Sequence, residues 1–208
     1  MILMPRALLL ALLCILPSAP SLAAGGPLGI DQRIAFDESG LWARRNQLAL
    51  EYGSIATVAA LALWEGGETR LGKTSWQAVD SMTLGAVAAT GLKLAFSRVR
   101  PVDSPNPNRW FQGGGNKSFP SGEVTLITSA VTPYLLEYGP DHPAVYALAI
   151  LPVYDAVARM KSWGHWQSDV LAGAALGGAL GYAMHERQLP LVLGVLPQGF
   201  SVGLSTRW

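Results

Sequence analysis

Five apolar runs, separated by shorter polar segments, occupy most of the chain after residue 47. They cover residues 48–64, 76–96, 123–138, 143–160 and 166–186. The first run is apolar almost all round apart from Glu51, which is typical of a helix that is buried on every side or surrounded by lipid. The pattern predicts an all-α bundle of five helices, or of six if the N-terminal segment adds one.

The composition of these runs bears on whether the bundle sits in a membrane. Most of them have about 16–21 residues, the lower edge of what crosses a hydrocarbon core of roughly 30 Å. The last run contains AGAALGGALGYA, whose small residues let neighbouring helices approach closely, as in membrane bundles. The acidic residues Glu51, Asp80 and Asp155 lie inside the runs and point the other way. We expect a membrane-embedded bundle, with a soluble all-α exported domain as the alternative.

The two ends of the chain differ from the helical body. Residues 1–23 combine one arginine, an apolar core and a small-residue segment, the three regions of a secretory signal peptide; an uncleaved first membrane helix is the alternative. Residues 24–47 form a mixed polar segment. The tail, residues 189–208, alternates around a Pro-Gln-Gly turn, which favours a short β-hairpin. The leader predicts export to the cell envelope.

Composition narrows the classes of function. Lys and Arg number 15 against 14 Asp and Glu, so no net charge favours nucleic acid as a partner. Cys14 is the only cysteine and lies within the leader. Cleavage would therefore leave a mature chain without disulfide or thiolate chemistry.

A long polar segment, residues 97–119, is rich in proline and glycine and predicts a loop; loops of this length inside a domain are usually functional or disordered. Lys93 and Arg100 lie at its start, seven residues apart, and share a face if the helix continues to the following proline. Two cations that face one way at a helix end indicate an anion site. We expect Arg109 and Lys117, farther along the loop, to lie in solvent.

Two further stretches add an imidazole and a helix terminus. His165 and Asp169 are four residues apart, so the carboxylate can hold one imidazole nitrogen and leave the other free. Ser121 and Gly122 begin an apolar run, and backbone N–H groups at a helix N-terminus bind anions. Glu123 comes next, where a first-turn carboxylate would by itself only complement the helix dipole.

The ordered set of motifs is more specific than any one of them. It resembles the three-part signature of the type 2 phosphatidic acid phosphatase (PAP2) superfamily, in the form Lys93-x6-Arg100-Pro101, Pro120-Ser121-Gly122 and Arg159-x5-His165-x3-Asp169. This superfamily also includes the bacterial class A acid phosphatases and the vanadium haloperoxidases. The resemblance covers about residues 48–186 and implies a helical catalytic domain over residues 48–188.

The resemblance also implies a mechanism that needs no metal and no cofactor. His165 would attack phosphorus to form a phosphohistidine that water then hydrolyses, and Asp169 would orient the imidazole. The phosphate oxygens would be bound by the side chains of Lys93, Arg100 and Arg159 and by the backbone N–H groups of Ser121 and Gly122.

Two positions depart from the family pattern. Ala158 stands where the family has serine, a minor difference because Arg159 is kept. Glu123 stands where the family has a histidine that protonates the leaving oxygen and later activates water. Neighbouring cations lower the pKa of a carboxyl group and burial raises it, so its protonation state stays open. We expect Glu123 to act mainly as the base for the water step, which favours good leaving groups such as diphosphates.

Three functions are compatible with these residues. The first is an inner-membrane phosphatase whose site faces the periplasm and acts on lipid phosphates or diphosphates. The second is a soluble periplasmic acid phosphatase that acts on small phosphate esters. The third is a degenerate member that binds phosphorylated lipid without turnover, because Glu123 replaces the family's histidine. The sequence does not indicate an oligomeric state.

Overall fold

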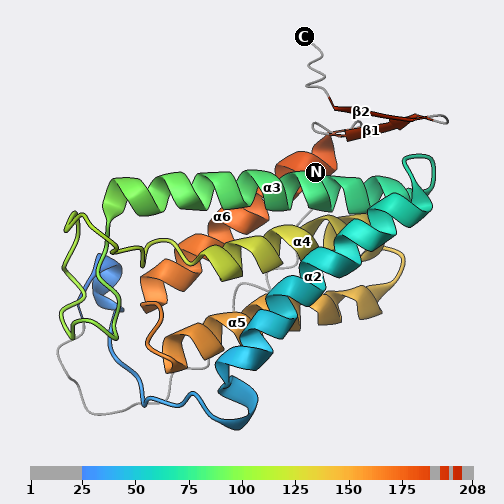
Figure 1. The fold of residues 1–208 in the computed structure, drawn as a ribbon. Helices are drawn as coiled ribbons and strands as arrows, with labels where there is room; N and C mark the ends of the chain where they lie inside the picture. The colour runs from blue at the N-terminus through green and yellow to red at the C-terminus, as the bar shows by residue number, and fades with distance from the viewer. Residues whose placement is uncertain (1–24, 188–192, 197–198, 203–208) are drawn as a thin grey trace.

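The structure, a computed structural model, describes residues 25–187 and two short strands in the C-terminal tail; the predicted leader lies outside the described residues. Five α-helices form the expected all-α bundle (Figure 1). They are α2 (Arg44–Glu65), α3 (Arg70–Phe96), α4 (Gly122–Tyr138), α5 (Ile150–Lys161) and α6 (Gln167–Glu186). Three 3₁₀-helices accompany them: η1 (Pro27–Gly29), η2 (Gly40–Trp42) and η3 (Pro143–Ala149), the last leading into α5.

The strands β1 (Leu193–Leu196) and β2 (Gly199–Val202) pair antiparallel, as expected for the tail.

The bounds of α3 differ from those of its apolar run. The helix begins at Arg70 rather than at Trp76, because the side chain of Thr69 caps it and accepts a hydrogen bond from Gly72 N at 2.9 Å. It ends at Phe96, because Ser97 adopts a left-handed conformation with φ of 40° and ψ of 46°. The prediction that Arg100 shares a helix face with Lys93 is therefore wrong, since Arg100 follows the helix end.

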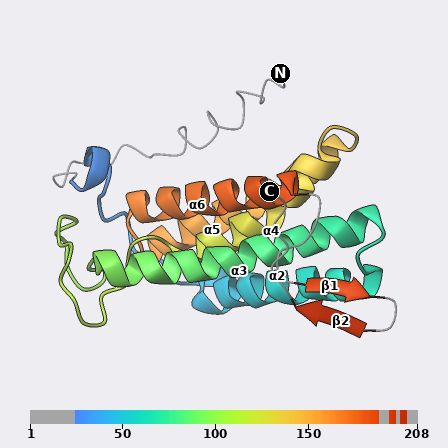
Figure 2. The same ribbon diagram turned by 90° about the horizontal axis from the view of Figure 1, so that it is seen from above.

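α4 is the central helix of the bundle. It packs against α2, α3, α5 and α6, and Figures 1 and 2 show it surrounded by these four helices. Its contact with α6 depends on glycines four residues apart: a Cβ at Gly177 would lie 2.4 Å from the carbonyl oxygen of Thr125, and one at Gly173 would lie 2.6 Å from that of Ser121. The predicted close approach of the small-residue run is confirmed.

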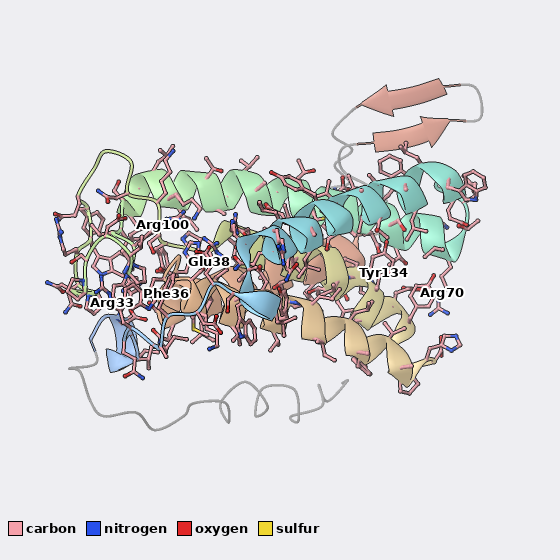
Figure 3. All side chains as sticks on the ribbon, turned by 60° about the horizontal axis from the view of Figure 1, so that its bottom comes forward. Arg33, Phe36, Glu38, Arg70, Arg100 and Tyr134 are labelled. Carbon is pink, nitrogen blue, oxygen red and sulfur yellow. The ribbon has the colours of Figure 1, made fainter. Side chains whose placement is uncertain are left out.

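The helix ends that carry the predicted site meet at one end of the bundle. The start of α2, the end of α3, the start of α4, the end of α5 and the start of α6 all lie there (Figure 1). Figure 3 shows Arg33 and Arg100 at this end and Arg70 at the opposite end. Alternating helix directions therefore bring together motifs that are far apart in the sequence.

The outer surface of the bundle is strongly apolar in places. α2 and the segment Pro143–Lys161 are long and apolar enough to cross a membrane by length and composition. Trp64 is 87% exposed and Leu63 is 71% exposed on α2. The acids Asp80 and Asp155, by contrast, are buried inside the bundle. Intramembrane acids usually face the bundle interior, so these two do not argue against a bilayer.

Candidate active site

His165 lies just before α6 with one ring nitrogen held and the other free. Its Nδ1 is 2.6 Å from the backbone oxygen of Ser118. A carbonyl only accepts hydrogen bonds, so Nδ1 carries the proton and the lone pair is on Nε2. Nε2 has no hydrogen-bond partner among the described residues. Burial lowers the pKa of His165 to about 3, with Arg159 and Lys93 adding to this effect and Asp169 opposing it. The imidazole is therefore neutral and able to attack an electrophile.

Asp169 lies near His165 but does not bond to it directly, which differs from the expectation. Its Oδ2 is 3.7 Å from His165 Nδ1, and it accepts hydrogen bonds from the Ser118 hydroxyl at 2.5 Å and from Trp166 N at 2.9 Å. Its Oδ1 pairs with Arg98 at 2.5 Å. Burial raises the pKa of Asp169, but the contacts with His165, Arg98 and Ser118 outweigh burial and lower it. The carboxylate acts on the imidazole through its charge and through Ser118.

Lys93 points across the loop towards the start of α4. Its Nζ donates to the carbonyl oxygens of Lys117 at 2.9 Å and Pro120 at 2.5 Å. Burial lowers its pKa to about 8, and the positive charge of Arg100 adds to the effect. Lys93 is therefore a cation at neutral pH that loses its charge at mildly alkaline pH. An anion bound beside it would raise its pKa and keep it charged.

The two arginines of the predicted phosphate clamp differ in their surroundings. Arg159 is buried, its Nη1 donates to Gln47 Oε1 at 2.9 Å, and its Nε has no hydrogen-bond partner among the described residues. The guanidinium fits only because residue 164 is glycine, where a Cβ would lie 2.4 Å from Nη2. Arg100 makes no side-chain hydrogen bond or ion pair within the described part of the chain, so its charge is available to a ligand.

The start of α4 supplies fewer backbone donors than expected. Ser121 N already donates to the carbonyl oxygen of Asp169 at 2.9 Å, so the prediction that it would bind phosphate does not fit this arrangement. The N–H of Gly122, at the helix start, has no partner within the helix. The Ser121 hydroxyl is fully buried and has no partner among the described residues. Buried donors without a partner, such as this hydroxyl and Arg159 Nε, fit a bound anion.

Glu123 has a partner that the motifs did not reveal. Arg44, the first residue of α2, holds both carboxylate oxygens, with distances of 2.5 Å to Oε2 and 2.9 Å to Oε1. Arg159 Nε lies 3.7 Å from Oε1. Gln47 accepts from both arginines, at 3.0 Å from Arg44 and 2.9 Å from Arg159, and so ties them together. The sequence held no signal for Arg44, because it lies 79 positions before Glu123 and belongs to none of the motifs.

The protonation state of Glu123, which the sequence left open, follows from these contacts. Burial raises its pKa, but Arg44, Arg159 and His165 lower it further than burial raises it. Glu123 is therefore an ionised acceptor at neutral pH and can take a proton, but has none to donate.

Arg98 is the second residue that the motifs missed. The sequence places it in a loop, yet it is fully buried and pairs with Asp31 and with Asp169 at 2.5 Å each. Arg109 and Lys117, in the same loop, are exposed as expected. The described residues contain no group of three or more His, Cys, Asp or Glu that could hold a metal ion.

Comparisons with known proteins agree with these motifs. The family model of the PAP2 superfamily matches residues 74–190, which include all three motifs. Over 110 residues the chain is 34% identical to a lipid A 1-phosphatase of Porphyromonas gingivalis, covering 50% of this chain and 22% of that protein. The fold is similar to the crystal structure of Aquifex aeolicus LpxE, with a TM-score of 0.51 and 18% identity over 68% of this chain and 84% of that one. The chain belongs to the PAP2 superfamily.

Proposed function

We propose that this protein is a cell-envelope phosphatase that removes phosphate from a phosphorylated lipid through a phosphohistidine at His165. One observation carries the proposal: the free Nε2 of a neutral imidazole lies within the field of a cluster of cations. Lys93 and Arg159 act electrostatically on His165, and Arg100 acts on both of them. A nucleophile beside cations matches phosphoryl transfer, where positioning and charge stabilisation supply most of the catalysis.

In the first step, Nε2 forms a bond to phosphorus and the bond to the leaving oxygen breaks. The imidazole ring becomes positive while Nδ1 keeps its proton, and that proton's hydrogen bond to Ser118 O and the nearby charge of Asp169 stabilise the ring. Lys93, Arg100 and Arg159 offset the charge on the phosphate oxygens. Because Glu123 has no proton to give, water protonates the leaving oxygen, which favours good leaving groups such as a diphosphate.

In the second step, water attacks phosphorus and the bond to Nε2 breaks. Glu123 accepts the proton of the attacking water, and His165 returns to its neutral form. Glu123 then loses this proton to solvent, where it neutralises the hydroxide left by the first step, and the site returns to its starting state. Glu123 is suited to this role because it is ionised and held in a fixed orientation by Arg44.

Two observations support a lipid substrate and a membrane location. The relative from Porphyromonas gingivalis is a lipid A 1-phosphatase, which makes a lipid A-type phosphate the first substrate to test. The exposed apolar side chains of α2 and the candidate membrane spans Arg44–Glu65 and Pro143–Lys161 suit a bilayer around the bundle. We propose that the site faces the periplasm from the inner membrane.

Phosphate release by the purified protein in detergent micelles tests the proposal. The substrates are lipid A, phosphatidic acid, undecaprenyl diphosphate and p-nitrophenyl phosphate, each assayed with a chelator. We expect release from at least one lipid, faster than from p-nitrophenyl phosphate. Equal rates on all four would contradict the lipid preference, and faster release from p-nitrophenyl phosphate by protein extracted without detergent would favour a soluble acid phosphatase.

A second function is favoured by the ion pair of Glu123. Because this carboxylate cannot donate a proton, the site could bind a phosphorylated lipid without turning it over. The same assay separates the two functions. A protein that binds lipid A-containing vesicles and releases no phosphate from any of the four substrates is a binding protein.

The charge of Lys93 predicts how activity depends on pH. With a pKa of about 8, Lys93 is charged below pH 8 and becomes neutral as the pH rises through that value. We expect kcat/KM to fall above pH 8, by on the order of 10²–10³-fold when the charge is lost completely. kcat should fall at a higher pH, because bound phosphate stabilises the charged lysine.

The matched variant is Lys93→Arg, because arginine stays charged at every pH of the assay. Its kcat/KM should lack the decline near pH 8. If kcat/KM of Lys93→Arg declines at the same pH, the decline comes from the titration of a group other than Lys93.

A further inference from the structure

The N-terminal polar segment is attached to the predicted active site by a buried aspartate. Asp31 pairs with Arg98 at 2.5 Å, and Arg98 pairs with Asp169, also at 2.5 Å. All three side chains have 0% exposure, so these charges interact without screening by water. Asp31 lies outside all three PAP2 motifs, and no local sequence pattern marks it.

Asp31 is held in place as firmly as the motif residues are. Its Oδ1 accepts from Ser168 N at 2.7 Å, and its Oδ2 accepts from the Ser168 hydroxyl at 2.7 Å. Its backbone pairs with Gly25, with N–O distances of 2.9 Å and 3.0 Å. A Cβ at Gly26, which has a φ of +70°, would lie 2.0 Å from Asp31 Oδ2. The segment is therefore shaped to deliver this carboxylate to the start of α6.

Arg98 has no freedom to pair elsewhere. Its guanidinium donates to Pro107 O at 2.7 Å and to the Ser168 hydroxyl at 2.8 Å, and it lies 4.2 Å from the ring centroid of Trp110. One cation is thus fixed between two carboxylates, Asp31 and Asp169, and the three charges sum to minus one.

The position of this net charge matters for His165. Asp169 Oδ2 is 3.7 Å from His165 Nδ1, and the ring becomes positive when Nε2 bonds to phosphorus. If Arg98 paired with Asp169 alone, its charge would cancel the charge that stabilises the ring. Asp31 balances Arg98 and leaves the charge of Asp169 to act on the imidazole.

We propose that Asp31 is a positioning residue of the active site: by sharing Arg98 with Asp169, it keeps a net negative charge beside His165 and so makes Nε2 a stronger nucleophile. The inference deepens the proposed function and rests on it where turnover is concerned. It also makes the N-terminal polar segment part of the site rather than a linker to the helical domain.

The test compares Asp31→Asn, which keeps the shape and removes the charge, with wild type and with Asp37→Asn. Asp37 is a matched control, because it belongs to the same segment and its carboxylate is partly exposed, 4.0 Å from the Lys161 ammonium. We expect Asp31→Asn to lower kcat by about 10–100-fold, with KM within about twofold. A loss of this size is usual when a residue that orients an active-site group without touching the substrate is replaced. Asp37→Asn should match wild type.

A second measurement does not depend on turnover. Diethyl pyrocarbonate acylates the free nitrogen of a neutral imidazole, and the chain has only three histidines, so mass spectrometry can follow each one. We expect Asp31→Asn to slow acylation of His165 relative to that of His142. If wild type releases no phosphate, the proposed function fails, while this ratio still decides the role of Asp31.

The background Arg98→Gln separates charge balance from a structural role. Because Asp31 acts through Arg98, adding Asp31→Asn to Arg98→Gln should change kcat and the acylation rate of His165 by less than about threefold. This comparison also holds if Asp31→Asn alone does not fold. The inference is overturned if folded Asp31→Asn keeps both rates within twofold of wild type, or if it lowers them equally in both backgrounds.

Discussion

Replacing His165 with alanine is expected to abolish phosphate release, with a loss on the order of 10⁴-fold or more in kcat/KM. The variant lacks the proposed nucleophile, and the remaining cations can only bind the phosphate group. The same variant should bind inorganic phosphate with little change, because Lys93, Arg100 and Arg159 remain. Release of phosphate measured against a chemical blank checks this expectation.

Trapping the phosphohistidine tests the role of His165 directly. Acid quenching loses phosphohistidine, so the reaction should be stopped with alkali and the phosphorylated residue located by mass spectrometry. We expect phosphate on His165 in wild type and none in His165→Ala. His142→Ala is the control, since His142 is exposed and lies at the opposite end of the bundle. Turnover by His165→Ala near the wild-type rate would exclude this histidine as the nucleophile.

Replacing Glu123 with glutamine is expected to slow the second step far more than the first. Without the carboxylate, no base accepts the proton of the attacking water, and steady-state turnover should fall by about 10²–10⁴-fold. Phosphohistidine should therefore accumulate, so that a rapid-quench experiment shows one fast turnover followed by a stall. Glu137→Gln is the matched control, because Glu137 also pairs with an arginine, Arg70, at 2.5 Å, but at the distant end.

Restoring the family's histidine gives a further distinction. In Glu123→His, Arg44 would lose its bidentate partner and stand unpaired beside a new imidazole. We expect Glu123→His to stay slow, and Glu123→His combined with Arg44→Gln to be faster than either single variant. Full activity of Glu123→Gln would leave Glu123 with a purely orienting role for Arg44 and Arg159. Activity gained by Glu123→His in an otherwise silent protein would identify a phospholipid-binding protein with a disabled site.

The helices were predictable because each one leaves a local signal. Apolar runs mark all five, and the glycines of α6 already indicated a close neighbour. The single helix predicted over residues 143–160 is wrong in its first part, which forms the 3₁₀-helix η3 before α5 begins at Ile150. The end of α3 was not predictable, because the left-handed conformation of Ser97 has no distinctive composition. With a right-handed α conformation at Ser97 the helix would continue towards Arg100, and the contacts of the loop that prevent this are not local.

The site was predictable only to the extent that its residues form motifs. The residues missed, Arg44, Asp31 and Arg98, belong to ion pairs whose partners lie 79, 67 and 71 positions away. No local sequence pattern predicts an ion pair between residues so far apart along the chain. The acceptor for His165 is equally hidden, because it is the backbone oxygen of Ser118, and every residue has one. The motifs predicted groups that would bind phosphate, and the structure added the ion pairs around them.

The bonds of Asp169 have a consequence for attempts to redesign this site. The same carboxylate oxygen that faces His165 accepts the N–H of Trp166 and thereby closes the first turn of α6, while the second oxygen binds Arg98. The side chain of Asp169 therefore stabilises the start of α6 and also acts on His165. We expect a library that varies residue 169 to lose most members to misfolding before catalysis can be measured. Glu123 and Arg44 pair mainly with each other, so varying them together offers a better route to a new reaction.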